Sequence, residues 1–422
     1  MPSLRLHNLA LVTAAGPERG PLTSWEALGF LPDADLVLTR DAAGTWRTTW
    51  LGPADSGDRP SADRTLDCGG RLVVPGLCDS HTHAVFAGDR AVEFNQRLAG
   101  RSYADIAASG GGINHTVAAT RRASLEELVT SAASRLSEMC AWGVRVVEVK
   151  TGYGLDVATE VRSLQAIAEL RRRFAGRLRI VATAMPGHAI PPEFKGDPQG
   201  YVTVVCDTIL PAMAACGVPV QFLDTFIERG YFDTAAAQRM AAIARGFGWG
   251  VKAHVDEFAD IGGLAWAVDH RATSVEHLLC TGAEGIARLA ASDTVAVCLP
   301  LTSVFLREPL APMRELVDAG ARVAVATDCN PGSAMTTNLL LAMQMAVLMG
   351  RLTPQEALRG VTRNAALALG EPGGWRGRVA VGEPFEATAF ALGRPDELFY
   401  RLGLPPCVWT PLNEAISPAL AG

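Results

Sequence analysis

The pattern of apolar and polar positions changes at about residue 71. From there to about residue 370, short apolar runs rich in β-branched residues alternate with Ala- and Leu-rich segments of helical period. This alternation is typical of an α/β fold with a parallel sheet, in which a helix follows each strand. Eight such strands are predicted, at residues 72–79, 144–149, 178–185, 222–227, 250–254, 273–277, 294–300 and 321–328. Eight strands with intervening helices close a (β/α)8 barrel of the TIM type.

The helices of the barrel are predicted from the apolar stripes between these strands. They cover residues 124–142, 157–174, 234–245, 261–268, 335–349 and 353–369. The first of them begins with Ser124 and carries Glu127 three residues later, which is the pattern of a capping box. Gly143 follows it as a stop signal.

Both ends of the chain have a different spacing of apolar residues. Short apolar pieces at residues 4–6, 9–12, 36–38 and 45–51, and again at 378–381 and 387–392, are separated by Gly, Pro and Asp. This spacing predicts small antiparallel strands. We therefore expect residues 1–70 and 371–422 to be the two halves of one composite, sandwich-like β-domain that flanks a barrel of residues 71–370.

Composition limits the partners and the compartment. The net charge is −6 and the basic residues are scattered, which argues against nucleic acid and anionic membranes as partners. Apolar runs stay shorter than the roughly 18 residues of a membrane helix, and residues 9–12 are too short for a secretory signal. Nine cysteines without a Cys-x-x-Cys pair predict reduced thiols, so we expect a cytoplasmic protein. The Ala- and Leu-rich helices favour a homodimer.

Polar side chains recur where the predicted barrel strands end. His81 and His83 lie two residues apart, so they point to the same side of a strand, and His254, His277 and Asp328 end strands five, six and eight. The carboxyl ends of barrel strands meet at one mouth. Imidazoles and a carboxylate together are ligands for a catalytic divalent metal that keeps room for water. The alternative for each histidine alone is an ordinary hydrogen-bonding group.

One carboxylate follows this set at a spacing that suits proton transfer. Glu257 stands three residues after His254, on the turn that leaves strand five. A general acid and base is needed to take a proton from water and give it to a leaving nitrogen. We favour Glu257 over its neighbour Asp256 for this role. The alternative is a carboxylate at a helix start, stabilised by the helix dipole.

The ligand pattern resembles the amidohydrolase superfamily, which carries His-x-His on strand one, His on strands five and six, and Asp on strand eight. Two-metal members often carry a bridging Lys on strand four, whereas this strand ends with Glu228, so the resemblance implies a single metal ion. Five segments between residues 70 and 370 narrow the likeness: DSHTHAVFAGDR (79–90), GGGI (110–113), EVKTGYGL (148–155), HAIPPE (188–193) and ATDCNPGS (326–333). Together they resemble the imidazolonepropionase family.

That resemblance implies hydrolysis of 4-imidazolone-5-propanoate to N-formimidoyl-L-glutamate in histidine degradation. It implies one zinc or iron ion held by His81, His83, His254 and Asp328. Catalytic roles fall to Glu257, His277, Asp328 and His188. Substrate contacts fall to Arg90, Tyr153, His188, Glu257 and Ser333, and product contacts to Tyr153, Asn330 and Gly332.

Three of these residues also fit plainer interpretations. Arg90 suits a propanoate because its guanidinium fork binds a carboxylate through two hydrogen bonds, but it also fits a surface ion pair with Glu93. Tyr153, between glycines, also fits a packed aromatic, and Gly332 a simple turn. Lys150 fits a catalytic amine or a carbamate-forming metal ligand, but it lies on strand two, so we expect it to be structural or to support the ligands from behind.

Two other functions stay open at this point. A cytosine- or guanine-type deaminase has a similar strand-five motif, but a nucleobase lacks a carboxylate for Arg90. A barrel that binds a small ligand without turnover is the other alternative. The chain departs from the family pattern at Ser80, where Pro is usual, at Pro186, and at Cys329, which replaces an aromatic residue. It also lacks the C-terminal strand motif common in the superfamily.

Overall fold

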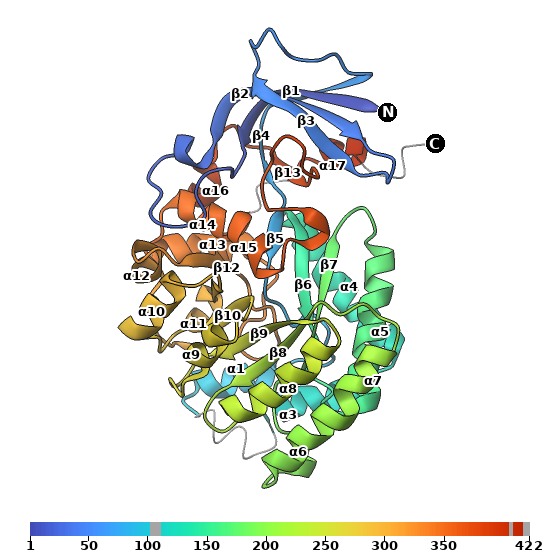
Figure 1. Ribbon diagram of the computed structural model, residues 1–422, viewed down its shortest axis with the longest axis vertical. Helices are drawn as coiled ribbons and strands as arrows, with labels where there is room; N and C mark the ends of the chain where they lie inside the picture. The colour runs from blue at the N-terminus through green and yellow to red at the C-terminus, as the bar shows by residue number, and fades with distance from the viewer. Residues whose placement is uncertain (102–110, 405–407, 417–422) are drawn as a thin grey trace.

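The computed structural model describes residues 1–101, 111–404 and 408–416, so Gly110 and Cys407 lie outside the described residues. Eight parallel strands form one sheet with neighbours in chain order (Figure 1). They are β5 (Leu77–Asp79), β6 (Val144–Lys150), β7 (Arg179–Gly187), β8 (Phe222–Ile227), β9 (Gly250–Val255), β10 (Ser274–His277), β11 (Val295–Cys298) and β12 (Arg322–Val325).

The first and last strands of this sheet meet just beyond their carboxyl ends. The amide of Asp328 donates to the carbonyl of His81 at 3.0 Å, and the amide of His83 donates to the carbonyl of Cys329, also at 3.0 Å. These two bonds close the barrel between β5 and β12. The predicted (β/α)8 barrel is therefore confirmed, and its closure lies among the predicted site residues.

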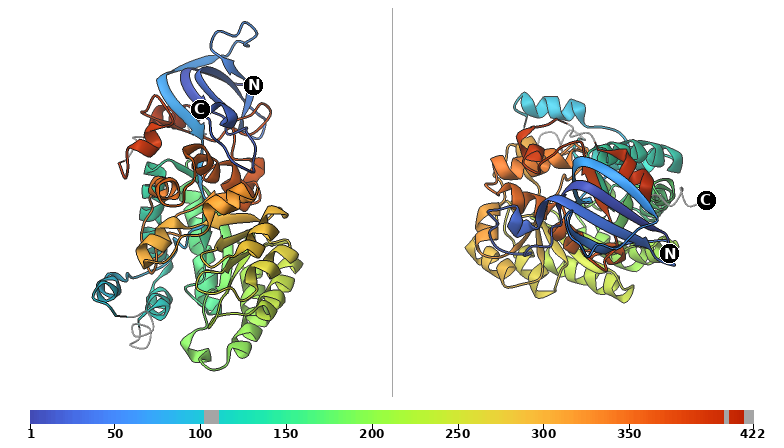
Figure 2. Two further views of the ribbon diagram at one scale, coloured as in Figure 1. Left: turned by 90° about the vertical axis from the view of Figure 1, so that its left-hand side faces the viewer. Right: turned by 90° about the horizontal axis from the view of Figure 1, so that it is seen from above.

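Helices cover the outside of the barrel (Figures 1 and 2). The α-helices are α1 (Ala91–Leu98), α3 (Ile113–Arg122), α4 (Leu125–Ala141), α5 (Val157–Arg173), α6 (Pro198–Val204), α7 (Leu210–Ala215), α8 (Thr234–Gly246), α9 (Gly263–Asp269), α10 (Ala283–Ala290), α11 (Pro300–Leu306), α12 (Met313–Asp318), α13 (Leu339–Leu348), α14 (Pro354–Gly360), α15 (Arg363–Ala368), α16 (Glu397–Tyr400) and α17 (Thr410–Ile416). The short helical turns are η1 (Glu26–Leu28), η2 (Pro192–Phe194), η3 (Val205–Ile209) and η4 (Pro372–Gly374). The capping box at the start of α4 is confirmed, since Ser124 and Glu127 exchange side-chain to backbone hydrogen bonds.

Three predicted elements differ from the structure. The expected strand over 72–79 is two strands, because the chain leaves one sheet for the other at Gly76, where a Cβ atom would lie 2.7 Å from the Arg145 side chain. The helix expected over 353–369 is divided into α14 and α15 by Thr362, whose φ of −127° and ψ of −93° are not helical. The helix expected from residue 335 begins later, where Asn338 caps α13.

Both ends of the chain build one five-stranded sheet, with the order β13-β4-β1-β2-β3. Its strands are β1 (Ser3–Val12), β2 (Phe30–Arg40), β3 (Trp46–Pro53), β4 (Arg64–Pro75) and β13 (Ala387–Phe390). The composite β-domain is confirmed, but β1 and β4 run parallel rather than antiparallel, and residues 378–381 form no strand. The limits at residues 70 and 370 stay predictions.

The composite sheet marks one end of the barrel. Strand β4 leads almost directly into β5, so the composite sheet lies beside the amino ends of the parallel strands (Figure 1). The carboxyl ends, with the predicted site residues, face the opposite end. No helix in the described ranges is long and apolar enough to cross a membrane.

Candidate active site

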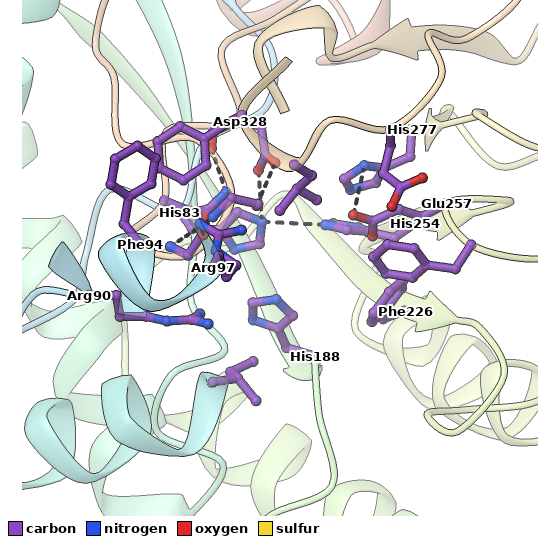
Figure 3. A pocket seen from close by; sticks show the side chains of 18 of the residues that line it. His83, Arg90, Phe94, Arg97, His188, Phe226, His254, Glu257, His277 and Asp328 are labelled. Carbon is purple, nitrogen blue, oxygen red and sulfur yellow. Dashed lines mark hydrogen bonds and ion pairs between the residues drawn. The ribbon is translucent and has the colours of Figure 1, made fainter. Parts of the chain in front are cut away.

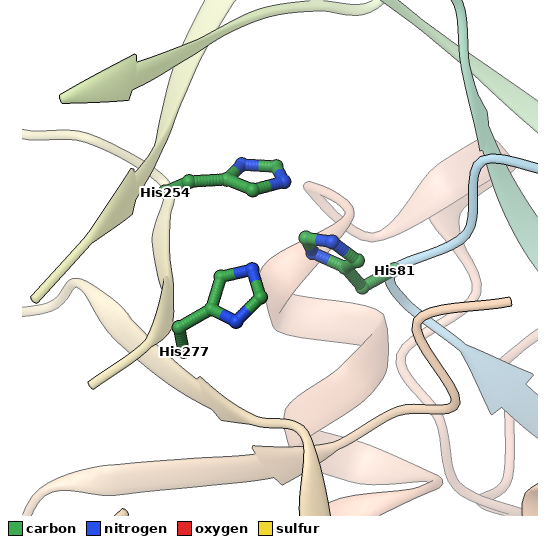
Figure 4. A group of neighbouring side chains, drawn as sticks. All are labelled: His81, His254 and His277. Carbon is green, nitrogen blue, oxygen red and sulfur yellow. The ribbon is translucent and has the colours of Figure 1, made fainter. Parts of the chain in front are cut away.

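Five predicted site residues, the four metal ligands and the catalytic His277, come together at the carboxyl ends of the strands. His81 and His83 follow β5, His254 lies in β9, His277 ends β10 and Asp328 follows β12. All five side chains are buried. Two overlapping groups each bring their ligand atoms within 4.8 Å of one another: His81 with His254 and His277, which Figure 4 shows, and His81 with His83 and Asp328. The structure therefore joins residues that lie up to about 250 positions apart in the sequence.

The spacing of these atoms fits a metal ion. The Nε2 atoms of His254 and His83 are 3.3 Å apart, and Asp328 Oδ1 lies 3.4 Å from Nε2 of His81 and 3.7 Å from Nε2 of His83 (Figure 3). Ligands at about 2.0–2.1 Å from a tetrahedral zinc ion lie about 3.3–3.4 Å from one another. These atoms can therefore share one ion.

The hydrogen bonding of the cluster also fits a metal ion. Both ring nitrogens of His81, and Nδ1 of His83 and His277, are buried without a hydrogen-bond partner in the part of the chain that the structure describes. Burial lowers the pKa of all three imidazoles well below the usual value, so the rings are neutral and each offers a lone pair. Buried polar atoms are rarely left without a partner unless a ligand or water completes them.

The backbone at the mouth is strained at residues of the cluster. Asp256, His277, Leu278 and Asp328 all have φ between +54° and +77°, a region that side chains with a Cβ atom seldom adopt. Such residues cost about 1–3 kcal/mol each and tend to gather at functional sites. Two of these residues, His277 and Asp328, are members of the cluster at the ends of their strands.

The carboxylate of Asp328 is held by the helix that follows β11. The Thr302 hydroxyl donates to Asp328 Oδ2 at 2.7 Å, which leaves Oδ1 facing the histidines. Burial raises the pKa of Asp328 to about 6 in the absence of a cation. A divalent ion at this centre would restore the ionised form.

Glu257 lies beside His277, as Figure 3 shows, with 3.6 Å between Oε1 and Nδ1. Burial raises the pKa of Glu257 well above its usual value, and the charge of Asp328 adds to the effect. Burial also lowers the pKa of His277, so both shifts disfavour a charged pair at this contact. Its neighbour Asp256 accepts a hydrogen bond from Thr281 at 2.7 Å and does not line the cavity. The preference for Glu257 over Asp256 agrees with this geometry.

A cavity of about 510 Å³ opens in front of the cluster. The predicted substrate-binding residues that line it are Arg90, Tyr153, His188, Glu257, Asn330, Gly332 and Ser333. His188 stacks on His83 with ring centres 4.7 Å apart, and its Nδ1 contacts the carbonyl oxygen of Gly152 at 3.1 Å. Its other ring nitrogen remains for a ligand. The structure therefore brings all the predicted site residues except His81 to the wall of one cavity, and His81 belongs to the ligand cluster beside it.

Arg90 both forms the ion pair with Glu93 and lies where it could contact a substrate. Its Nε donates to Glu93 Oε2 at 2.7 Å, so the ion pair with Glu93 exists, yet its side chain is largely buried and lines the cavity. A Cβ atom on Gly332 would lie 2.2 Å from Arg90 Nη1. The absence of a side chain at Gly332 thus leaves room for the guanidinium. Arg97 donates to the Gly332 carbonyl oxygen at 3.1 Å and holds the same loop.

The loop of Asn330 to Ser333 is shaped by the Asn330 side chain. Its Oδ1 accepts from the amides of Gly332 and Ser333, both at 2.8 Å, and its Nδ2 donates to the carbonyl oxygen of Asp328 and to Ser333 Oγ. Asn330 therefore orders the loop beside Asp328. Its implied contact with product stays a prediction.

Beneath the histidines lies a layer of buried charges that sequence reasoning largely missed. Lys150 Nζ contacts Asp224 Oδ2 at 2.6 Å and Glu148 Oε2 at 2.8 Å, and Lys252 Nζ contacts Glu148 Oε1 at 2.7 Å and Glu276 Oε1 at 3.4 Å. All five side chains have no exposed surface. Lys150 thus has the structural role that its position on strand two predicted. The signal that could have revealed this layer is the presence of charged residues inside apolar strand segments.

Two further carboxylates hold the loops of the mouth. Glu160 accepts from the amides of Gly154 and Leu155 beside Tyr153, at 2.8 and 2.9 Å. Glu228 accepts from the amides of Phe258 and Ala259 at 2.9 and 3.2 Å. Glu228 is therefore turned toward the loop that carries Glu257, and nothing in the sequence distinguished this role.

Comparisons with known proteins agree with the fold. The amidohydrolase family model matches residues 239–415. Among solved structures, a variant of atrazine chlorohydrolase from Arthrobacter aurescens TC1 has a TM-score of 0.67 at 19% identity and covers 96% of this chain and 92% of its own. The 5-methylcytosine deaminase from Klebsiella pneumoniae has a TM-score of 0.67 at 16% identity, covering 94% and 93%. At such identities these likenesses concern the fold alone.

Curated relatives are much closer in sequence. An imidazolonepropionase from Bradyrhizobium sp. (strain BTAi1 / ATCC BAA-1182) is 44% identical over 405 residues, which cover 95% of this chain and 96% of the relative. An imidazolonepropionase from Caulobacter vibrioides (strain NA1000 / CB15N) is 43% identical over 364 residues, covering 85% and 89%. With this identity over most of its length, the chain belongs to the imidazolonepropionase family of amidohydrolases.

Proposed function

We propose that the protein hydrolyses the ring C–N bond of 4-imidazolone-5-propanoate to give N-formimidoyl-L-glutamate, a step of histidine degradation. The observation that carries the proposal is the cluster of buried, unpartnered imidazole nitrogens facing Asp328, with Glu257 beside it in a cavity that also contains Arg90. The relatives named imidazolonepropionase support the choice of substrate.

His81, His83, His254 and Asp328 would hold one metal ion. When bound, such an ion lowers the pKa of water toward about 7 and so supplies hydroxide at neutral pH. The same ligand types suit zinc and iron, and we propose one or the other. The spacing of about 3.3–3.7 Å between the facing ligand atoms supports a single centre.

Glu257 moves the proton. Glu257 lines the cavity, and burial raises the pKa of its carboxyl group, which is the direction that suits a group that accepts a proton and then returns it. We assign it the proton that water loses during attack on the ring carbonyl carbon. It then passes that proton to the ring nitrogen as the C–N bond breaks, leaving a carboxylate and a formimidoyl group.

His277 is placed at the carbonyl oxygen of the substrate in this proposal. Its imidazole lines the cavity and burial lowers its pKa well below the usual value, so the neutral ring can donate one hydrogen bond. A donor placed where negative charge develops stabilises the transition state more than the ground state. Burial also lowers the pKa of His188 to about 3, and its Nδ1 donates to the Gly152 carbonyl oxygen, so its Nε2 would accept a hydrogen bond from a ring N–H of the substrate.

The propanoate tail is assigned to Arg90, whose guanidinium can form two hydrogen bonds with a carboxylate. Tyr153 and Ser333 would contact the ring, and Asn330 and Gly332 the opened product. The close packing of Arg90 on Gly332 supports this placement, because it fixes the guanidinium at the cavity wall.

We also propose that the protein works in the cytoplasm as a homodimer. The free and mostly buried thiols of the described residues support the compartment. Exposed apolar residues of α1, such as Val92 and Leu98, support an interface with a second copy.

The test is turnover of freshly generated 4-imidazolone-5-propanoate by protein of known metal content, followed by loss of the imidazolone absorbance. Cytosine and guanine are the parallel substrates. We expect hydrolysis in proportion to bound metal, saturating at one ion per chain. Release of ammonia from a nucleobase without imidazolone turnover would replace the proposal with a deaminase, and silence on all substrates would leave a binding protein.

A further inference from the structure

His254 has its two ring nitrogens in very different surroundings. Nδ1 lies 3.0 Å from Asp224 Oδ1, and Nε2 faces the cluster, 3.3 Å from Nε2 of His83. A neutral imidazole carries one proton, so one nitrogen donates and the other offers a lone pair. Which nitrogen carries the proton decides whether His254 can act as a ligand.

Asp224 has no freedom to turn. Its Oδ1 contacts His254 and its Oδ2 contacts Lys150 Nζ at 2.6 Å, and Lys150 is held in turn by Glu148 at 2.8 Å. An ammonium group can only donate and an ionised carboxylate can only accept. The proton of the bond to His254 must therefore sit on Nδ1, which leaves the Nε2 lone pair directed into the mouth.

We propose that Asp224 is a positioning residue that fixes His254 in the Nδ1–H tautomer. Lys150 donates to the other oxygen of Asp224, so only a carboxylate at this position can accept from both Lys150 and His254. The proposal rests on the proposed function in one respect only, that His254 Nε2 is the metal-binding atom. Outer partners of this kind orient a ligand histidine without touching the ion or the substrate.

The third cluster of possible ligands, Asp224 with His254 and Glu276, fits this role better than a second metal site. The ammonium groups of Lys150 and Lys252 already contact Asp224 and Glu276, at 2.6 and 3.4 Å. A metal ion there would meet two positive charges. Oδ2 of Asp224 and Oε1 of Glu276 are thus occupied by the layer itself, and Glu276 Oε2 is the one of their four oxygens without a hydrogen-bond partner in the described residues.

The decisive variant is Asp224→Asn. Because Lys150 only donates, the amide must turn its oxygen toward Lys150 and its NH₂ group toward His254 Nδ1. Nδ1 must then accept, and the ring proton moves to Nε2. We expect the affinity for Zn²⁺, measured by competition with a chelator, to fall by about 10- to 100-fold, the range typical of such partners.

Glu276→Gln is the matched control. It makes the same change from carboxylate to amide in the same layer, but Glu276 Oε2 is 3.8 Å from His254 Nδ1, too far for a hydrogen bond. We expect wild-type affinity for Zn²⁺. An equal loss of Zn²⁺ affinity in both variants would mean that the layer acts only through its charge, and it would overturn the proposal. Unchanged affinity in Asp224→Asn would overturn it as well.

A second measurement reports the tautomer directly. Nitrogen NMR of metal-free protein with ¹⁵N-labelled histidine distinguishes a protonated ring nitrogen from a bare one, with His254 identified by its loss in His254→Gln. We expect a bare Nε2 in the wild type and a bare Nδ1 in Asp224→Asn. A protonated Nε2 in the wild type refutes the proposal even if the Asn variant fails to fold. Neither readout uses substrate, so failure of imidazolone turnover would be a separate result.

Discussion

The barrel holds two neighbouring groups of buried polar side chains that differ in one respect. In the mouth, both ring nitrogens of His81 and one each of His83 and His277 have no partner among the described residues. In the layer beneath, Lys150 and Lys252 each contact two carboxylates within 3.4 Å. Both groups are sealed from solvent. Within the described part of the chain, the mouth therefore leaves four imidazole nitrogens without partners, whereas each ammonium group of the layer has two carboxylates beside it, and Glu276 Oε2 is a layer atom that also lacks a hydrogen bond.

This difference suggests that the mouth binds a ligand and that the layer supports it. Burying polar groups without partners costs stability, and natural proteins keep such groups mainly where a ligand completes them. Paired ammonium and carboxylate groups instead fix side-chain directions, and here one of them, Asp224, contacts the ligand histidine His254. We expect changes in the mouth to cost metal and turnover, and changes in the layer to cost stability first.

The largest effect is expected from His81→Ala. This ring lies within ion-pair distance of Asp328 and at the centre of both ligand groups. Its loss should lower metal affinity by more than the roughly 100-fold that outer partners cost, so that metal content and turnover fall together. Metal analysis after dialysis measures this. His7→Ala, in the composite sheet, is the control, and full metal content in His81→Ala would remove this residue from the ligand set.

Glu257→Gln separates proton transfer from metal binding within the mouth. We expect turnover to fall by about 10²- to 10⁴-fold, the usual contribution of a general acid and base, while metal content stays at the wild-type level. Steady-state rates on metal-quantified protein give the comparison. Asp256→Asn is the matched control, because Asp256 is bonded to Thr281 and lies outside the cavity lining. Near-normal turnover in Glu257→Gln would exclude the proton relay.

Lys252→Met tests the layer. Removing this ammonium leaves Glu276 without its cation and Glu148 with only Lys150, and an unpaired charge in a buried ion network typically costs about 3–5 kcal/mol. Denaturant unfolding of metal-free protein should show this loss. Arg172→Met removes a cation from an exposed pair with Glu169 and should change little. A stable Lys252→Met variant would mean that the layer does not hold the barrel together.

The barrel was predictable because its signals are local and repeated. Apolar strands and helical stripes alternate from residue 71 onward, and each needs only a short window to be recognised. The passage from β4 to β5 at Gly76 was not predictable, because both strands read as one apolar run and only packing against Arg145 separates them. The parallel pairing of β1 with β4 likewise depends on contacts between distant segments.

The site was predictable to the extent that single residues carry its chemistry. Strand-end histidines and Asp328 identified the mouth, and the family they indicated is confirmed by the relatives. The layer was missed because Glu148, Asp224 and Glu276 are informative only as a set, and the sequence does not say which of them meet. Thr302 could not be found either, since nothing in its neighbourhood points to Asp328.

The smallest effect is expected at a partly exposed ion pair away from the layer. Its contribution to stability can be compared with that of the buried layer. Glu18 contacts Arg363 and, at 3.1 Å, Arg322; burial alone would raise the pKa of Glu18, but the two arginines outweigh it and hold that pKa below the usual value. A carboxylate with a lowered folded-state pKa stabilises the protein above its unfolded pKa. That stability is lost as the pH falls through the folded-state pKa.

Glu18→Gln should therefore cost at most about 1 kcal/mol of unfolding free energy at pH 7, because the pair is partly solvated. The difference from wild type should vanish in acid. Unfolding at pH 7 and below pH 4 measures it. A cost equal to that of Lys252→Met would show that burial does not set the energetic difference between the layer and the surface.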